Sequence, residues 1–453
     1  MEWMTAMYDA VSYSRLLTEI TLGFHIIFAT IGVGVPVMIA LAEWRGIKRN
    51  DPYYILLARR WTRGFVITVA IGVVTGTSIG LQLSLLWPSF MQVAGQAIGL
   101  PLFMETFAFF VEAIFLGIYL YTWDRFKNPF VHFMLIIPIA LAASASAFFI
   151  TCVNAFMNTP QGFTLENGVI RNVEPIKAMF NPATATKVSH VLSSAYMTCA
   201  FVLAAIAAFS LIKGRSDKVY ARKALKLTLV AGIIFGITNA LIGDFSGKFL
   251  AAYQPVKLAA AEWHFETKDK AELIMGGFLT EDNEIKYALK IPYALSILAG
   301  GSPNTVVHGL NETPPELQPP LRIHYYFDGM VLIGTLTIAI GVVYLWFSRA
   351  KRKKPLPRWL LIAIVCCGPL SVIAIELGWI YAEVGRLPWI LVGYMKVEDG
   401  ATTANNVHIM LLLFCLLYLV LAISCIKVLA KLFRNAHVAD ELLSLGIEGG
   451  KRK

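Results

Sequence analysis

About nine long apolar stretches constrain this chain more than any other feature of its sequence. They cover approximately residues 20–42, 62–86, 101–123, 130–156, 188–213, 225–243, 325–347, 358–379 and 407–432. Each is long enough to cross a bilayer, which takes about 20 apolar residues in a helix. Lipid offers the backbone no hydrogen-bonding partner, so each stretch is expected to be helical. Short alternating segments are missing, which excludes a β-barrel. The sequence therefore predicts an all-α, polytopic bundle of about nine spans.

The composition agrees with a membrane protein. Hydrophobic residues make up 57% of the chain and charged residues only 15%, against about 25% charged in soluble domains. A soluble enzyme and a disordered chain are therefore excluded. The six cysteines lie in apolar runs and form neither CxxC nor CxxCH, so structural disulfides, a zinc site and c-type haem are not expected. Glu2, Asp9 and Arg15 interrupt the first 19 residues, which is unlike a cleavable signal peptide.

Basic residues predict the orientation of the chain in the membrane. They gather in the loops after predicted spans 1, 5 and 7 and in the C-terminal tail. They are Arg45, Lys48, Arg49, Arg59, Arg60, Arg63, Lys213, Arg215, Lys218, Arg222, Lys223, Lys226, Arg349, Lys351, Arg352, Lys353, Lys354, Arg358, Lys427, Lys431, Arg434 and the final Lys-Arg-Lys. Cytoplasmic loops carry such an excess, so the N-terminus is expected outside and the C-terminus in the cytoplasm. The net charge of +10 then reflects topology, and no nucleic-acid partner is expected.

One loop divides the chain into three parts. Residues 244–324 form a long, polar, charge-mixed segment on the outer side, and it ends in a proline-rich run at 313–320. A loop of this length is usually functional or a disordered linker. Residues 1–243 hold the first six predicted spans, and residues 325–453 hold the last three with the tail.

Ionisable groups inside the predicted spans are candidates for function, because charge is costly in hydrocarbon. His25, Glu105, Glu112 and Glu376 qualify. Glu105 and Glu112 are two helical turns apart and therefore share a face. Two stacked carboxylates can relay protons where water joins them; the alternative is that they make two unrelated polar contacts.

Several of these groups are expected at one depth. In the predicted orientation His25, Glu105, His190 and Met330 lie within about two turns of the outer surface, and Glu383 follows span 8 at the same level. A His–Met pair can ligate a haem iron on both faces, and one His or carboxylate leaves a face open. A multi-histidine copper centre is not expected, because no two histidines share a helical spacing.

Specific motifs then resemble a known family. Residues 378–389, GWIYAEVGRLPW, resemble the Gly-Trp…Glu-x-Gly-Arg-Gln-Pro-Trp signature of subunit I of cytochrome bd quinol oxidases. The run Gly72–Thr77 is similar to the family's second-span motif, and residues 244–262 are similar to the start of its quinol-binding loop. Phe24-His25 matches its N-terminal haem-ligand histidine. The resemblance covers essentially the whole chain.

The resemblance implies haem ligands. His190 and Met330 would be the axial ligands of a low-spin haem b, while His25 and Glu383 would each ligate a high-spin haem. The cofactors implied are two haems b, low-spin and high-spin, and a haem d or a third haem b. Arg386 would pair with a carboxylate or a haem propionate, and Trp379 of the signature would also contribute to cofactor binding.

The resemblance also implies roles in proton and quinol chemistry. Glu105 and Glu112 would carry protons or support the high-spin pair, and Lys257 and Glu262, with Asp244, would bind or deprotonate quinol. The implied reaction oxidises two quinols at the outer face and reduces O₂ to two waters. Its protons come from the cytoplasm, which generates a membrane potential. A homologous subunit II and a small single-span subunit are the implied partners, in a bacterial cytoplasmic membrane.

Two positions depart from the family pattern, and three alternatives remain. Leu387 replaces the usual Gln, and Asp328 stands where some members have Arg. A proton-coupled transporter using His25, Glu105 and Glu112 would explain the intramembrane carboxylates but not the signature. A diheme b-type quinone reductase would need paired histidines on facing spans. A haem-b-only, cyanide-insensitive oxidase has the same sequence features as the d-type enzyme.

Overall fold

Long helices dominate the structure, which is a computed structural model. It describes residues 9–166, 169–214, 217–350, 356–434, 437–444, 447–448 and 451–452. The basic residues Arg215 and 351–354 of the orientation argument lie outside these residues, as do Glu2 and Lys453. Within the described chain, nine helices are long and apolar enough to cross a membrane. This confirms the predicted all-α, polytopic bundle.

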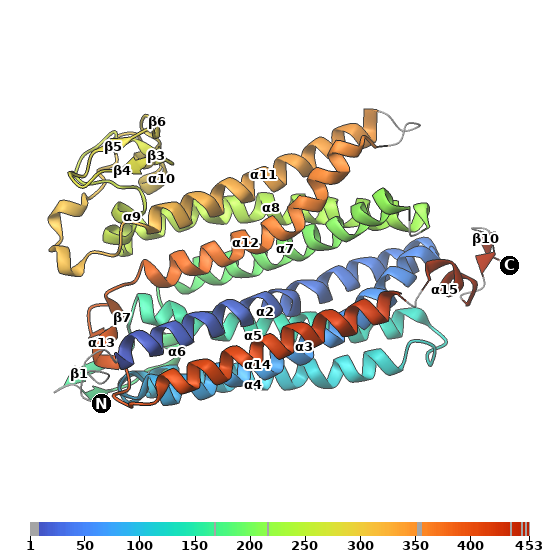
Figure 1. Cartoon of the computed structure of the whole chain (residues 1–453), viewed down its shortest axis with the longest axis horizontal. Helices are drawn as coiled ribbons and strands as arrows, with labels where there is room; N and C mark the ends of the chain where they lie inside the picture. Colours follow the sequence, from blue (N-terminus) through green and yellow to red (C-terminus); the bar gives the residue numbers. More distant parts are fainter. Residues whose placement is uncertain are drawn as a thin grey trace.

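The nine long helices lie side by side along one axis (Figure 1). They are α2 (Ala10–Arg49), α3 (Pro52–Leu86), α4 (Pro88–Tyr121), α5 (Pro129–Asn158), α7 (Thr184–Lys213), α8 (Lys218–Tyr253), α11 (Ile323–Ala350), α12 (Arg358–Val384) and α14 (Val407–Arg434). Most extend beyond the predicted apolar stretch. Polar side chains fix these ends: Asp9 accepts hydrogen bonds from the backbone N–H groups at the start of α2, and Asp51 caps α3 before Pro52.

Small residues bring the helices close together. A Cβ atom on Gly34 of α2 would lie 2.5 Å from Cys199 Sγ and 2.6 Å from the Ala195 carbonyl of α7. Gly368 of α12 approaches Ala205 of α7 in the same way. Interfaces of this kind are typical of helices that associate in lipid, where packing replaces the hydrophobic effect. Helix α2 thus lies inside the bundle, against α3, α5 and α7.

The segment between α8 and α11, predicted to be an outer loop, is a folded unit at one end of the bundle (Figure 1). Helix α8 continues to Tyr253, beyond the expected boundary at 243, and Asp244 pairs with Lys248 one turn later. Then follow α9 (Pro255–Ala261), β3 (Leu273–Met275), β4 (Phe278–Leu279), β5 (Ile285–Lys286), β6 (Leu289–Ile291), α10 (Ala294–Gly300), η1 (Leu310–Glu312) and η2 (Pro315–Leu317). Strand β3 pairs antiparallel with β6, and β4 with β5.

Shorter elements close both ends of the bundle. At the outer-loop end are β1 (Thr164–Glu166), β2 (Val169–Arg171), α6 (Pro175–Met179), β7 (Trp389–Leu391), β8 (Met395–Lys396) and α13 (Val397–Gly400). At the opposite end are α15 (Val438–Ser444), β9 (Ile447–Glu448) and β10 (Lys451–Arg452). Glu441 of α15 binds Arg60 and Arg63 of α3, which holds the tail against the bundle.

Candidate functional site

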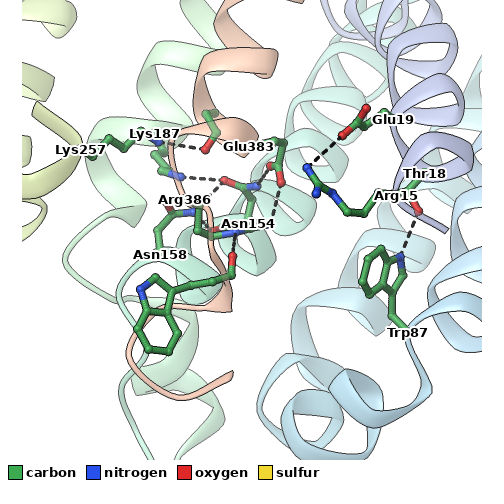
Figure 2. A network of polar contacts seen from close by, with 12 residues as sticks. Arg15, Thr18, Glu19, Trp87, Asn154, Asn158, Lys187, Lys257, Glu383 and Arg386 are labelled. Atoms are coloured by element: carbon green, nitrogen blue, oxygen red, sulfur yellow. Dashed lines mark hydrogen bonds and ion pairs between the residues drawn. The ribbon is translucent and has the colours of Figure 1, made fainter. Parts of the chain in front are cut away.

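A partly buried polar network surrounds Glu383 at the end of α12 (Figure 2). Its Oε2 atom lies 2.7 Å from Arg386 Nη2, and its Oε1 atom accepts a hydrogen bond from the Asn154 amide of α5. Lys187 of α7 donates to the Asn154 amide oxygen at 2.8 Å. Lys257 of α9 donates to the Ala382 carbonyl at 2.9 Å. Three separate elements, α5, α7 and α9, thus converge on the signature segment.

This network contains more basic side chains than acidic ones. Lys187, Lys257 and Arg386 surround a single carboxylate, Glu383. The Arg386 Nη1 atom is buried and has no hydrogen-bond partner among the described residues. Buried charge is normally paired, so the site suits a further anionic group. A haem propionate has that charge, and the residues present therefore fit the haem that the sequence implies.

Gly385 explains part of the signature. A Cβ atom at this position would lie 2.6 Å from Lys257 Cε and 2.7 Å from the Tyr381 carbonyl. Only glycine therefore lets the Lys257 side chain pass along the end of α12 and reach Ala382. The same lysine lies over the Tyr381 ring, 4.8 Å from its centroid. The glycine of Glu-x-Gly-Arg thus has a packing reason, since it admits a cation next to Glu383.

His25 of α2 is oriented by the second-span motif. Its Nδ1 atom lies 2.8 Å from Thr75 Oγ1 of α3, which leaves Nε2 available as a ligand. A Cβ atom on Gly76 would come within 3.2 Å of the imidazole. Across the helix, a Cβ atom on Gly23 would be 3.5 Å from a Glu376 carboxylate oxygen. The other Glu376 oxygen is buried without a partner in the described chain.

Met330 and His190 lie on separate helices that both pack against α12. Met330 Sδ of α11 would be 2.9 Å from a Cβ atom on Gly378, so the glycine before Trp379 makes room for the thioether. His190 of α7 has a buried Nδ1 atom with no partner among the described residues. Trp379 is partly buried on α12, one turn before Glu383. Within the described residues, no hydrogen bond therefore occupies the side chain of either proposed ligand.

Lys257 and Glu262, at the start of the loop after α8, are both buried. Lys257 contacts the end of α12, and Glu262 contacts strand β3. Glu262 is fully buried, and it accepts a hydrogen bond from the Ile274 backbone N–H at 3.3 Å. Burial, aided by the charge of Asp328, raises the pKa of Glu262 to about 8. Burial, aided by the charge of Arg386, lowers the pKa of Lys257 to about 7 although Glu383 opposes that shift. Asp244 differs, since it is exposed on α8 and pairs with Lys248.

The remaining predicted carboxylates lie on α4. Glu105 accepts a hydrogen bond from Ser146 of α5 at 3.1 Å, and Glu112 is buried two turns further along the helix. Asp328, at the position of the departure, lies 3.2 Å from His324 Nε2 and accepts a hydrogen bond from the Gly276 backbone N–H. It therefore ties α11 to the hairpins of the loop.

Sequence reasoning missed Asn154 and Lys187. Asn154 is uncharged, so it is not among the ionisable residues of the predicted spans. Lys187 precedes the apolar stretch that was expected to begin at 188, although it lies one turn before His190 on α7. A signal existed, because a lysine within one turn of a candidate ligand is unusual in a membrane helix.

These features define an integral-membrane protein with a cluster of basic side chains around one carboxylate, at one end of a helical bundle. The sequence model for cytochrome bd terminal oxidase subunit I matches residues 13–437. The chain belongs to this family, and it is a quinol:O₂ oxidoreductase with haem cofactors.

Individual relatives agree along the whole chain. A solved structure of bd oxidase from Geobacillus thermodenitrificans is 63% identical, covers 95% of this chain and 99% of that chain, and has a TM-score of 0.90. A Bacillus subtilis (strain 168) protein provisionally assigned as cytochrome bd menaquinol oxidase subunit I is 43% identical, over 96% of this chain and 99% of its own. The Bacillus subtilis (strain 168) cytochrome bd ubiquinol oxidase subunit 1 is 29% identical, over 90% of each.

Proposed function

We propose that this chain is the haem-carrying subunit of a terminal oxidase that oxidises quinol at the outer face, reduces O₂ to water and takes the protons from the cytoplasm. The buried cation-rich network at Glu383 is the observation that carries the proposal. It combines the Glu383 carboxylate with a buried Arg386 Nη1 donor that has no partner among the described residues and could bind a propionate. The family membership makes haem the expected occupant.

His25, Glu383, His190 and Met330 are proposed to hold the haem irons. The orientation of His25 by Thr75 and the room for Met330 at Gly378 support this assignment. His190 and Met330 would close both faces of a low-spin haem b, whereas His25 and Glu383 would each leave a face open. When bound, the haems supply one-electron transfer and O₂ chemistry that no side chain provides. Haem d or a third haem b completes the set.

Arg386 and Lys187 would hold the propionate charge near Glu383. Arg386 already binds the carboxylate through Nη2, while Nη1 is buried and has no partner in the described part of the chain. Asn154 lies between Glu383 and Lys187 and donates to the carboxylate. Asn154 would therefore orient Glu383, while Arg386 and Lys187 would neutralise the charge of the prosthetic group. Trp379 would pack against it from the preceding turn of α12.

Lys257 and Glu262 are proposed to act on quinol. Glu262 holds its proton at neutral pH because burial raises its pKa to about 8. Once ionised, it would accept a proton from a quinol hydroxyl, and the proton would leave on the outer side. Lys257, with a pKa lowered to about 7, would bind the quinol oxygen as a donor. Asp244, exposed and paired with Lys248, would contribute at the rim of the loop.

Glu105 and Glu112 are proposed to deliver protons to the site of O₂ reduction. They share one face of α4, and Ser146 of α5 holds the outer carboxylate. Quinol protons would leave outside while O₂ protons arrive from the cytoplasm, so turnover would separate charge and build a membrane potential. This requires the N-terminus outside and the C-terminal tail in the cytoplasm, which the basic loops support.

A homologous subunit II and a small single-span subunit are the proposed partners. The relatives are named as subunits of an oxidase, which supports a multi-subunit enzyme. Their bacterial sources support the bacterial cytoplasmic membrane as the location. The transporter alternative does not account for the Glu383–Arg386 network or the family match.

Quinol-driven O₂ uptake by the purified complex tests the proposed function. Two variants of the loop start, Lys257→Met and Glu262→Gln, should each lose about 100-fold or more in kcat/KM for quinol, as expected when an acid–base group is removed. Their haem spectra should stay unchanged. Lys268→Met is the control, because this lysine is exposed on the same loop. Full activity of both buried-site variants would contradict the quinol assignment.

A further inference from the structure

A second buried polar cluster lies at the end of the bundle opposite Glu383. Glu43 of α2, Tyr119 of α4 and His132 of α5 are each almost fully buried. Tyr119 donates its hydroxyl to Glu43 Oε2 at 2.6 Å, and His132 Nδ1 lies 2.7 Å from Glu43 Oε1. His132 Nε2 lies 3.0 Å from the Tyr119 carbonyl. One carboxylate thus bridges a phenol and an imidazole from three helices.

The cluster lies one aromatic layer below the bundle surface. Trp123 covers His132, with ring centroids 4.2 Å apart, and the Arg59 guanidinium of α3 lies 5.0 Å from the Trp123 ring centroid. Arg59 Nη2 is 2.5 Å from Asp124 Oδ1, and the Asp124 side chain is 78% exposed. Asp124, Arg59 and the Trp123 ring therefore lie in sequence between the surface at the α4–α5 loop and His132.

The cluster lies on the same face of α4 as the proposed proton carriers Glu105 and Glu112. Tyr119 follows Glu112 by seven residues, as Glu112 follows Glu105, so the three side chains form one stripe on α4. Each step is about 10 Å along the helix axis. On the antiparallel α5, His132 pairs with the Tyr119 level and Ser146 with the Glu105 level. The stripe leads from the cluster to the outer carboxylate.

A purely structural role is the competing explanation. A buried polar network can join helices, but apolar side chains of similar volume often do so as well or better. Here all three side chains can exchange a proton, and the carboxylate is hydrogen-bonded to both neighbours. Groups of this kind within a membrane bundle are functional candidates by default.

We infer that Glu43, Tyr119 and His132 form the cytoplasmic proton-uptake site of this subunit, which supplies the Glu112–Glu105 stripe on α4. Asp124 and Arg59, with the Trp123 ring, lie between this site and the surface. The inference rests on the proposed function, since it concerns protons consumed in O₂ reduction. It places a route for proton uptake within this chain, in addition to any route through a partner subunit.

Glu43→Gln in the complete oxidase complex tests the inference. Glutamine keeps the length of the side chain and a hydrogen-bond acceptor for Tyr119, but it cannot carry the proton. Proton uptake and O₂ consumption should both slow about tenfold or more, while the haem spectrum and the reduction of haem by quinol stay unchanged. Tyr119→Phe, which removes one hydroxyl and leaves the Glu43–His132 pair, should slow both less severely.

Asp51→Asn is the matched control. Asp51 is a half-buried carboxylate at the same end of the bundle, paired with Lys223, and asparagine keeps its capping role. Its proton uptake should match the wild type. Glu43→Gln and Tyr119→Phe complexes that take up protons at the wild-type rate would overturn the inference. Should Glu43→Gln not accumulate, Tyr119→Phe alone decides. A wild-type complex without quinol-driven O₂ uptake would instead refute the proposed function.

Discussion

Glu262 shows how burial can set the chemistry of one residue. The loop removes its carboxyl group from water and raises the pKa to about 8, with Asp328 adding to the shift. A protonated acid cannot accept a proton from quinol. We therefore predict that kcat/KM for quinol rises with pH up to about 8, as measured by O₂ uptake at saturating O₂. Glu262→Gln should be slow and should lose this rise. A rise that survives in Glu262→Gln would contradict the assignment, and Glu266→Gln, an exposed loop carboxylate, is the control.

The same pKa has a consequence for stability. The folded loop holds the Glu262 proton more tightly than an unfolded chain, whose carboxyl has an ordinary pKa of 4.5. This contribution is fully present below that value and is lost as pH rises through about 8. We predict that the protection of the β3 and β6 amides from hydrogen exchange, corrected for intrinsic base-catalysed exchange, falls between about pH 4.5 and about pH 8. Glu262→Gln should flatten this dependence, and an unchanged pH dependence in the variant would contradict it.

At the scale of elements, the α11–α12 contact depends on Gly378. A Cβ atom there would lie 2.9 Å from Met330 Sδ, closer than atoms pack. We predict that Gly378→Ala displaces the thioether and changes the low-spin haem spectrum of the purified complex. Gly334→Ala is the control on α11, because nothing lies within 4 Å of its added Cβ. An unaltered spectrum in Gly378→Ala would argue against Met330 as a ligand.

The elements also show what sequence alone could predict. The apolar stretches identified all nine long helices of the described chain, because lipid leaves the backbone no other choice. Helix ends were less accurate, since caps such as Asp9 and Asp51 set them. The hydrogen bonds that join Asn154 and Lys187 to Glu383 could not be predicted, because they depend on how α5, α7 and α12 align in space. The contact between Glu43 and His132 could not be predicted either, for the same reason.

At the scale of the whole molecule, the orientation is open to direct test. The start of α2 and the end of α14 lie at opposite ends of the bundle (Figure 1), as an odd number of spans requires. We predict that green fluorescent protein fused after Arg434 fluoresces, while alkaline phosphatase at that position is inactive. The reverse should hold for fusions at Gly301, in the outer loop. Fluorescence at Gly301 instead of Arg434 would invert the topology.

We propose above that haem held by this chain transfers electrons from quinol to O₂. The most direct measurement is a dithionite-reduced minus air-oxidised visible spectrum of the purified complex, followed by addition of quinol in place of dithionite. The account predicts b-type haem bands that quinol also produces; a far-red chlorin band would identify haem d, and its absence a third haem b. Folded complex without haem absorbance would contradict the ligand roles of His25, His190, Met330 and Glu383.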